Sequence, residues 1–87
     1  MARTLQGYVV ADPKICHGQL TFRGTRILVS QVLDEVASGR SWEGIIDDWG
    51  GAISKEAISD AVRLARRVLL EHQHEFLPET ADNAHPG

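Results

Sequence analysis

The sequence has few of the residues that small proteins use for cross-links and metal sites. Cys16 is the one cysteine in 87 residues, which excludes an intrachain disulfide. Four histidines are present, but Cys16 and His17 are neighbours that would point apart in a strand. His72 and His74 are two residues apart, on different faces of a helix. Because a zinc site needs about four well-placed ligands, we expect no metal and no cofactor.

Long apolar runs and an excess of positive charge are also missing. No segment approaches the roughly 20 apolar residues that cross a bilayer, and the N-terminal segment lacks the apolar centre of a signal peptide. We therefore expect a cytoplasmic protein with no membrane contact. The net charge of −3 is unlike that of a simple basic nucleic-acid-binding surface.

The charges are unevenly divided along the chain. Residues 1–40 carry five cations and three acids, net +2, whereas residues 41–87 carry four cations and nine acids, net −5. This division fits a protein with two kinds of contact, and it fits ordinary scatter in a short chain equally well.

The first third of the chain predicts a small β-element over residues 8–29. Tyr8–Val10 and Leu20–Phe22 are β-forming stretches separated by glycine, proline and aspartate. We expect two or three short strands here. So small a sheet needs a helical layer or a partner chain to cover it.

Three helices are predicted next, over about residues 30–38, 42–49 and 55–72, because apolar residues recur at three- and four-residue spacing. The expected N-caps are Ser30, Ser41 and Ser54, and the expected helix-ending glycines are Gly39, Gly50 and Gly51. The expected apolar face of the last helix is Ile58, Ala61, Val62, Ala65, Val68 and Leu69. Residues 1–72 then form one small domain, and residues 73–87 form a polar, flexible tail. The last two helices have the outline of a helix-turn-helix.

Arg23-Gly24-Thr25-Arg26 places two cations beside a glycine at the junction of the β-element and the first helix. As a binding site, the motif would present backbone N–H groups and two guanidinium forks to a phosphate or to a partner's carboxylate. As a structural turn, glycine bends the chain, the threonine bonds locally and the arginines pair with acids. We favour the turn. The expected acidic partners are Asp12, Asp34 and Glu35.

The start of the last helix supplies the candidate DNA contacts, which are Ser54, Lys55, Ser59 and Arg63. Glu56 and Asp60 lie among them and would repel phosphates. The alternative is an amphipathic helix with solvated Asp60–Arg63 and Arg67–Glu71 pairs. The residues alone leave both interpretations open.

Catalysis has little support in the sequence. Asp47 and Asp48 are neighbours on different sides of a helix, so they cannot easily share a proton or a metal ion. The capping serines need no catalytic explanation, and no serine, histidine and aspartate set has the context of a site. We expect a binding protein and not an enzyme.

The residues from Val9 to Ala65 resemble the bacterial domain-of-unknown-function 433 family. The most specific part is the Arg-Gly-Thr-Arg-Ile block at residues 23–27. The remaining matches are Asp12-Pro13, Ile15, Gly18, Val29, Gly39-x-Ser41, Ile45-Ile46 and the segment from Ser54 to Ala61. Three departures from the family pattern are His17–Leu20, Leu28 and Trp49–Ile53, and the last of these alters the turn of the helix-turn-helix.

The resemblance implies a mainly α fold, in which a short N-terminal β-element leads into a three-helix, homeodomain-like helix-turn-helix. It also implies an antitoxin that neutralises a PIN-like ribonuclease toxin and represses their shared promoter, so the implied partners are that toxin and operator DNA. The alternatives are a stand-alone DNA-binding regulator and a protein-interaction scaffold. A homodimer is expected because the sheet is small and the chain is short for a core. Trp42 and Trp49 are read as core or dimer contacts.

Overall fold

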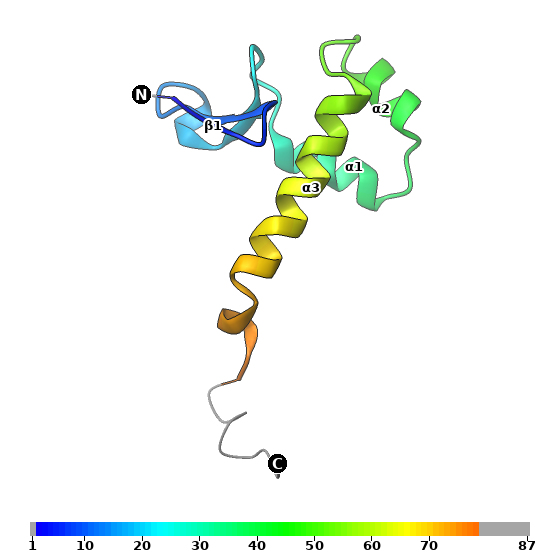
Figure 1. Cartoon of the computed structure of the whole chain (residues 1–87). Coiled ribbons are helices and arrows are strands. Elements are labelled where there is room, and N and C mark those ends of the chain that lie inside the picture. Colours follow the sequence, from blue (N-terminus) through cyan, green and yellow to red (C-terminus); the bar gives the residue numbers. More distant parts are fainter. Residues whose placement is uncertain (1, 79–87) are drawn as a thin grey trace.

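The computed structural model describes residues 2–78 and has a small sheet beside three helices (Figure 1). The elements are β1 (Arg3–Leu5), β2 (Val9–Ala11), the 3-10 helix η1 (Cys16–Gly18), β3 (Leu20–Phe22), α1 (Val29–Ala37), α2 (Trp42–Asp48), α3 (Lys55–Glu71) and the 3-10 helix η2 (Gln73–Phe76). The prediction of a mainly α fold with an N-terminal β-element and three helices is confirmed.

The sheet is antiparallel, with strand order β1-β2-β3. In its register, Val10 lies between Thr4 and Thr21. The three strands agree with the expected two or three, but β1 lies before the segment predicted to be β, so the β-element begins earlier than the sequence indicated. Cys16 and His17 do not lie in a strand, because both have positive φ values, 50° and 58°, inside η1.

One hydrophobic core joins the sheet to all three helices. The sheet contributes Val9 and Phe22, which are 0% and 2% exposed, and α1 adds Val32. Ile45 of α2 and Ile58 of α3 are both fully buried against them. The sheet is thus covered on this side by the chain's own helices, as a three-stranded sheet of this size requires.

The helix ends follow the sequence with one exception. The side chains of Ser41 and Ser54 accept hydrogen bonds from the N–H groups of Gly44 and Ala57, as expected of N-caps. The prediction for Ser30 is wrong, because α1 begins at Val29 and its N-cap is Leu28, which has no side-chain acceptor. The Leu28 carbonyl accepts the backbone N–H groups of Gln31 and Val32, at 3.2 and 3.4 Å.

Helix α3 is buried in the core along its first half and extends from the body of the protein along its second half. Its first half packs in the core through Ile58, Ala61 and Leu64, the last of which was missing from the predicted face. Its second half extends past the body (Figure 1), and Val68 and Leu69 are 44% and 57% exposed although the sequence placed them on the apolar face. The radius of gyration is 16.3 Å, whereas a compact chain of this length would have about 12 Å.

The chain does not become irregular at residue 73. Gln73–Phe76 forms η2, which corrects the expected start of a flexible tail, and residues 79–87 of that tail lie outside the described part of the chain. Within residues 2–78, no helix has both the length and the apolar character that crossing a bilayer requires.

Candidate functional site

The Arg23–Arg26 motif forms a tight turn held by its threonine. The Thr25 hydroxyl donates to the Phe22 carbonyl at 2.8 Å and accepts the Ile27 N–H at 3.0 Å. The Thr25 N–H also donates to the Phe22 carbonyl, at 3.0 Å. Gly24 has a φ of +79° with open space around it, a backbone conformation that other residues adopt at a cost. The expected local role of the glycine and the threonine is confirmed.

The expected pairing of the two arginines with acids is wrong. Neither Arg23 nor Arg26 has an ion pair or a side-chain hydrogen bond within residues 2–78, and both are exposed. The Arg23 guanidinium instead lies over the Tyr8 ring, 5.4 Å from its centroid, a distance typical of a cation–π contact. The Arg23 N–H donates to the Tyr8 carbonyl at 2.8 Å, which holds the two residues side by side. The turn therefore presents two exposed guanidinium groups without acidic partners on a fixed backbone.

Arg23 and Ser54, which the sequence assigned to different sites, line the same surface hollow. The hollow has a volume of about 210 Å³ and lies between the Tyr8–Arg23 pair and the residues that begin α3. Phe22, Ala57 and three residues of the α2–α3 turn, Gly51, Ala52 and Ile53, complete its lining. Arg26 does not take part, so the two arginines face different surroundings.

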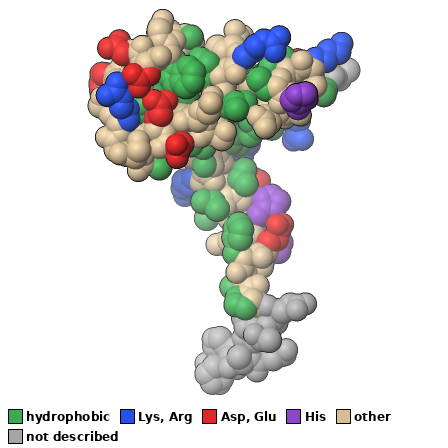
Figure 2. All heavy atoms as spheres, turned by 180° about the vertical axis from the view of Figure 1, so that it is seen from behind, with side chains coloured by type: hydrophobic (Ala, Val, Ile, Leu, Met, Phe, Trp, Pro, Cys, Tyr) green, Lys and Arg blue, Asp and Glu red, His purple; other side chains and the backbone are tan. Residues whose placement is uncertain are grey.

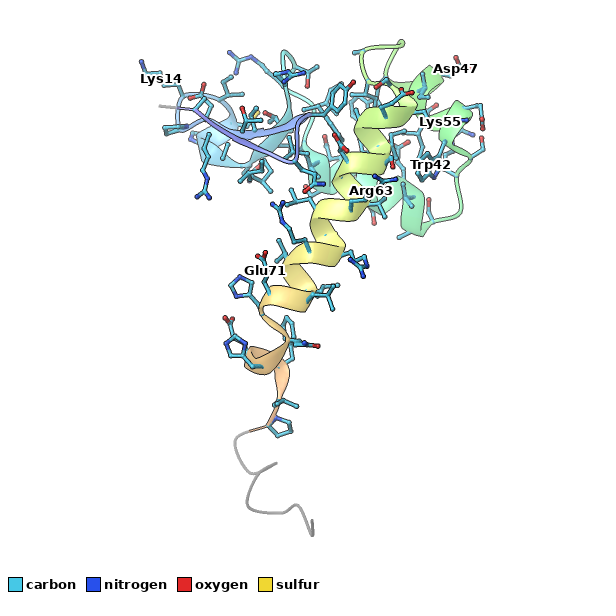
Figure 3. The ribbon with its side chains drawn as sticks, in the orientation of Figure 1. Lys14, Trp42, Asp47, Lys55, Arg63 and Glu71 are labelled. Carbon is cyan, nitrogen blue, oxygen red and sulfur yellow. The ribbon has the colours of Figure 1, made fainter. Side chains whose placement is uncertain are left out.

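The candidate DNA contacts divide into two groups on α3. Ser54 uses its hydroxyl as the N-cap acceptor, 3.1 Å from the Ala57 N–H. Lys55, Ser59 and Arg63 are four residues apart and share one face of the helix, with Lys55 and Arg63 exposed and Ser59 half-buried. Figure 3 shows Lys55 beside α2 and Arg63 two turns further along α3.

Acidic side chains reduce the charge of this face. The Lys55 ammonium lies 3.7 Å from a carboxylate oxygen of Glu43 on α2. The Arg67–Glu71 pair was expected and is present at 3.9 Å, whereas Asp60 and Arg63 form no ion pair within the described chain. Arg63 thus remains the free cation of the predicted set.

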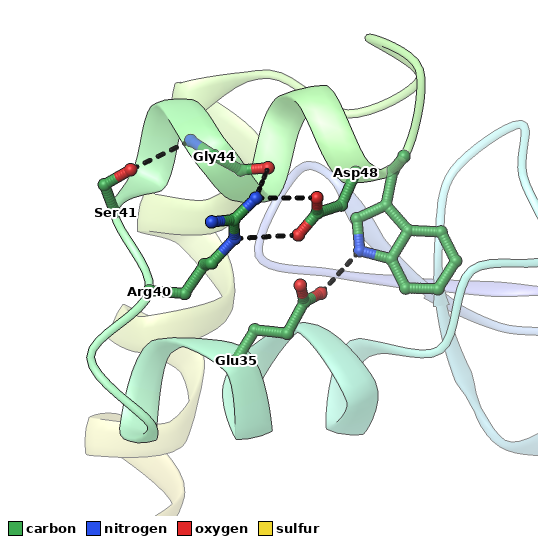
Figure 4. Close-up of polar contacts among 6 residues, drawn as sticks. Glu35, Arg40, Ser41, Gly44 and Asp48 are labelled. Carbon is green, nitrogen blue, oxygen red and sulfur yellow. Dashed lines mark hydrogen bonds and ion pairs between the residues drawn. The ribbon is translucent and has the colours of Figure 1, made fainter.

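Arg40 connects the α1–α2 junction to the end of α2 (Figure 4). Its guanidinium donates two hydrogen bonds to the Asp48 carboxylate, at 2.9 and 2.8 Å, and a longer one to the Gly44 carbonyl at 3.4 Å. The Trp49 indole N–H donates to Glu35 on α1 at 2.6 Å. These contacts fix α2 against α1, so they set the position of the turn that leads into α3.

Two carboxylate contacts shift pKa values. The hydrogen bond from Arg40 lowers the pKa of Asp48 below the ordinary range of an aspartate, and the pKa of Arg40 is raised for the same reason. At the end of α3, the hydrogen bond to Glu75 raises the pKa of His72, whose Nδ1 lies 2.7 Å from the carboxylate. His74 also lies 3.9 Å from Glu75, so the two histidines approach the same acid despite their spacing.

Acidic and basic side chains are unevenly distributed over the body. Figure 2 shows acidic side chains gathered over the end that holds α2, and basic side chains at the end that holds the sheet. The acids of α2 are Glu43, Asp47 and Asp48, whereas the sheet end carries Arg3, Lys14, Arg23 and Arg26. The uneven division of charge along the sequence therefore also appears on the surface of the folded protein, with more acids at the α2 end and more cations at the sheet end.

Tyr8 and Arg40 take part in these sites although the sequence analysis gave them no role there. The sequence predicts a strand that includes Tyr8, but β2 begins at Val9. The contact of Tyr8 with Arg23 depends on the pairing of β2 with β3. Arg40 lies next to Ser41 and eight residues before Asp48, a spacing that has no meaning until both ends of α2 are known. Within residues 2–78, no three histidine, cysteine, aspartate or glutamate side chains are placed to share a metal ion.

Comparison with known proteins gives one family. The family model described as "Protein of unknown function (DUF433)" matches residues 9–65, which is more than half of the chain. No curated protein and no solved structure matches this chain. The matched residues run from β2 through the Arg23–Arg26 turn, α1 and α2 into the second half of α3. This chain therefore belongs to the DUF433 family.

Proposed function

We propose that this protein is the antitoxin of a toxin–antitoxin pair, which binds and neutralises a PIN-like ribonuclease without catalysing a reaction itself. Membership of the DUF433 family supports the proposal, because the resemblance of the Arg-Gly-Thr-Arg-Ile block implies that role. The observation that carries it is the geometry of that block. Two exposed guanidinium groups without acidic partners stand on a turn that is already ordered.

A nuclease suits such a turn chemically. Metal-dependent nucleases hold their ions with carboxylates, and the guanidinium fork of arginine matches a carboxylate in shape and charge. The turn also loses little conformational freedom on binding, since the Thr25 hydrogen bonds fix it beforehand. Arg23 and Arg26 would then be the residues that contact the toxin.

The test is co-purification with the products of the two flanking genes. The tagged chain should bring down a nuclease in stoichiometric amount and suppress its ribonuclease activity. The Arg23→Ala/Arg26→Ala variant should lose both effects. The matched control is Arg3→Ala/Lys14→Ala, which removes the same charge from the sheet end and should keep both. If the tagged chain brings down no nuclease, or if both variants lose it equally, the proposal is wrong.

DNA binding is a second candidate, and the arrangement of α2 and α3 favours it. The two helices are joined by a short turn, and Lys55, Ser59 and Arg63 lie on one face of the second. Promoter DNA should bind with an affinity that falls steeply as salt rises, because each neutralised phosphate releases counterions. Arg63→Ala should reduce that slope by about one. Binding that does not depend on salt would exclude this role.

A further inference from the structure

An apolar groove runs along one side of the molecule between α1, β3 and α3. Its walls include Leu20, Val29 and Leu33 on one side and the α3 residues Leu64, Val68 and Leu69 on the other. It holds about 350 Å³, and a second apolar hollow shares Leu20, Val29 and Leu33 with it. The core thus opens to the surface along α3.

The α3 wall of this groove continues beyond the body of the protein. Val68 and Leu69 are 44% and 57% exposed, and Phe76 of η2 is 65% exposed. This projecting part of the chain, residues 68–76, is called the stalk below, and Figure 2 shows hydrophobic side chains spaced along it. The molecule therefore carries a concave apolar surface and a projecting apolar helix that share Val68 and Leu69.

We infer that a second copy of this chain covers this surface, with the two α3 helices packed antiparallel about a two-fold axis near Leu69. A two-fold interface must be complementary to itself, and a groove that continues into a stalk meets this condition. The stalk of each copy lies along the groove of the other. Phe76 of one copy then reaches the level of Val62 and Ala61 of the second.

The charges beside the apolar stripe fit the antiparallel register. Arg67 and Glu71 lie on the same flank of α3, where they approach each other at 3.9 Å. Arg67 Nη1 also donates a hydrogen bond to Gln6 Oε1 of the same chain, at 2.8 Å. In an antiparallel pair centred on Leu69, Arg67 of each copy lies opposite Glu71 of the second copy. The two ion pairs, one on each side of the axis, are related to each other by the two-fold symmetry.

This inference does not depend on the proposed antitoxin function, and its test uses the purified full chain alone. Sedimentation velocity from about 1 to about 100 µM covers the affinities of a modest interface. The wild type should be a dimer that dissociates on dilution. Leu69→Lys should raise the dissociation constant at least about 100-fold, because the two-fold axis places both lysines in the apolar interface.

Leu70→Lys is the matched control. Leu70 is 48% exposed, close to the value for its neighbour Leu69, but it lies about 100° further round the helix and outside the groove. The Leu70→Lys chain should dimerise like the wild type. Circular dichroism at a concentration where every variant is monomeric separates a loss of folding from a loss of dimer.

A charge exchange tests the register. Arg67→Glu should weaken the dimer, because it opposes like charges across the axis, and Arg67→Glu/Glu71→Arg should restore it. Arg63→Glu makes the same charge change on another face of α3 and should have little effect. A wild type that stays monomeric at the highest concentration overturns the inference. Equal effects of Leu69→Lys and Leu70→Lys also overturn it, and failure of the double exchange overturns the antiparallel register.

Discussion

The buried hydroxyl of Thr21 predicts that a single substitution will stabilise the protein. Thr21 is 0% exposed in the middle of β3, and its Oγ1 has no hydrogen-bond partner within the described residues. Its cross-strand partner is Val10, and it also forms an isolated bridge with Leu28, so its neighbours in the sheet are apolar. Valine has the shape of threonine and suits a strand. Thr21→Val should therefore raise the free energy of unfolding.

The size of the effect follows from the cost of leaving a buried polar group unpaired. That cost is about 1–3 kcal/mol, and each kcal/mol shifts the melting temperature of a domain of this size by roughly 4–8 °C. We expect Thr21→Val to melt at least about 4 °C above the wild type. For a marginally stable domain, this is a large fraction of the total stability.

Thr25→Val is the matched control, because it is the same chemical change four residues later with the opposite expected sign. The Thr25 hydroxyl has two partners, the Phe22 carbonyl and the Ile27 N–H. Their loss should cost about 1–2 kcal/mol. Thermal and urea unfolding, followed by circular dichroism at one fixed protein concentration, measures both variants. If Thr21→Val destabilises the chain as Thr25→Val does, the Thr21 hydroxyl is paired and the reasoning is refuted.

Three further predictions concern the ends of α2 and α3. Gly44→Ala should give no stability in the wild type, since its Cβ would lie 2.8 Å from Cζ of Arg40 and 3.0 Å from Oγ of Ser41. In Arg40→Ala only the Ser41 contact remains, so the same change should recover up to about 1 kcal/mol of helix propensity. Melting the four proteins of this cycle tests the prediction. The contribution of the Arg40–Asp48 pair is present above the ordinary aspartate pKa and is lost as pH falls through the lowered pKa of Asp48. The stability difference between wild type and Arg40→Ala should shrink in acid, and a constant difference would contradict this. Glu75→Gln should lower the pKa of His72 in an NMR titration, and the stabilisation of η2 by this contact, present at low pH, should disappear as pH rises through the raised pKa.

The helices were predictable because their signals are local. Ser41 and Ser54 could be recognised as N-caps since each hydroxyl bonds a backbone N–H three residues later. Gly39, with a φ of +88°, ends α1 as the sequence indicated. The error at Ser30 has the same local cause, because a serine near the start of a helix looks like a cap even when Leu28 occupies that position.

The remaining features depend on residues that are distant in the sequence. Strand β1 has only three residues, of which Arg3 and Thr4 are exposed, so it carries no apolar alternation. Arg23 meets Tyr8 and not an acid because β2 and β3 are adjacent in the sheet. The spacing of Val68 and Leu69 correctly identifies a face of the helix. Periodicity cannot show that this apolar face continues past the body of the protein, where Val68 and Leu69 are exposed.

Because α3 continues without a break from the core into the stalk, it fixes the direction in which the side chains of the stalk point as well as the place of the stalk. Each residue turns the helix by about 100°, so a single insertion after Leu64 would leave the core in place and rotate every side chain beyond it by that amount. The stalk would then point its apolar side chains away from the groove without any change in composition. Insertions of about seven residues would almost restore the original direction. The length of this helix can therefore change only in steps that keep the phase of its two halves.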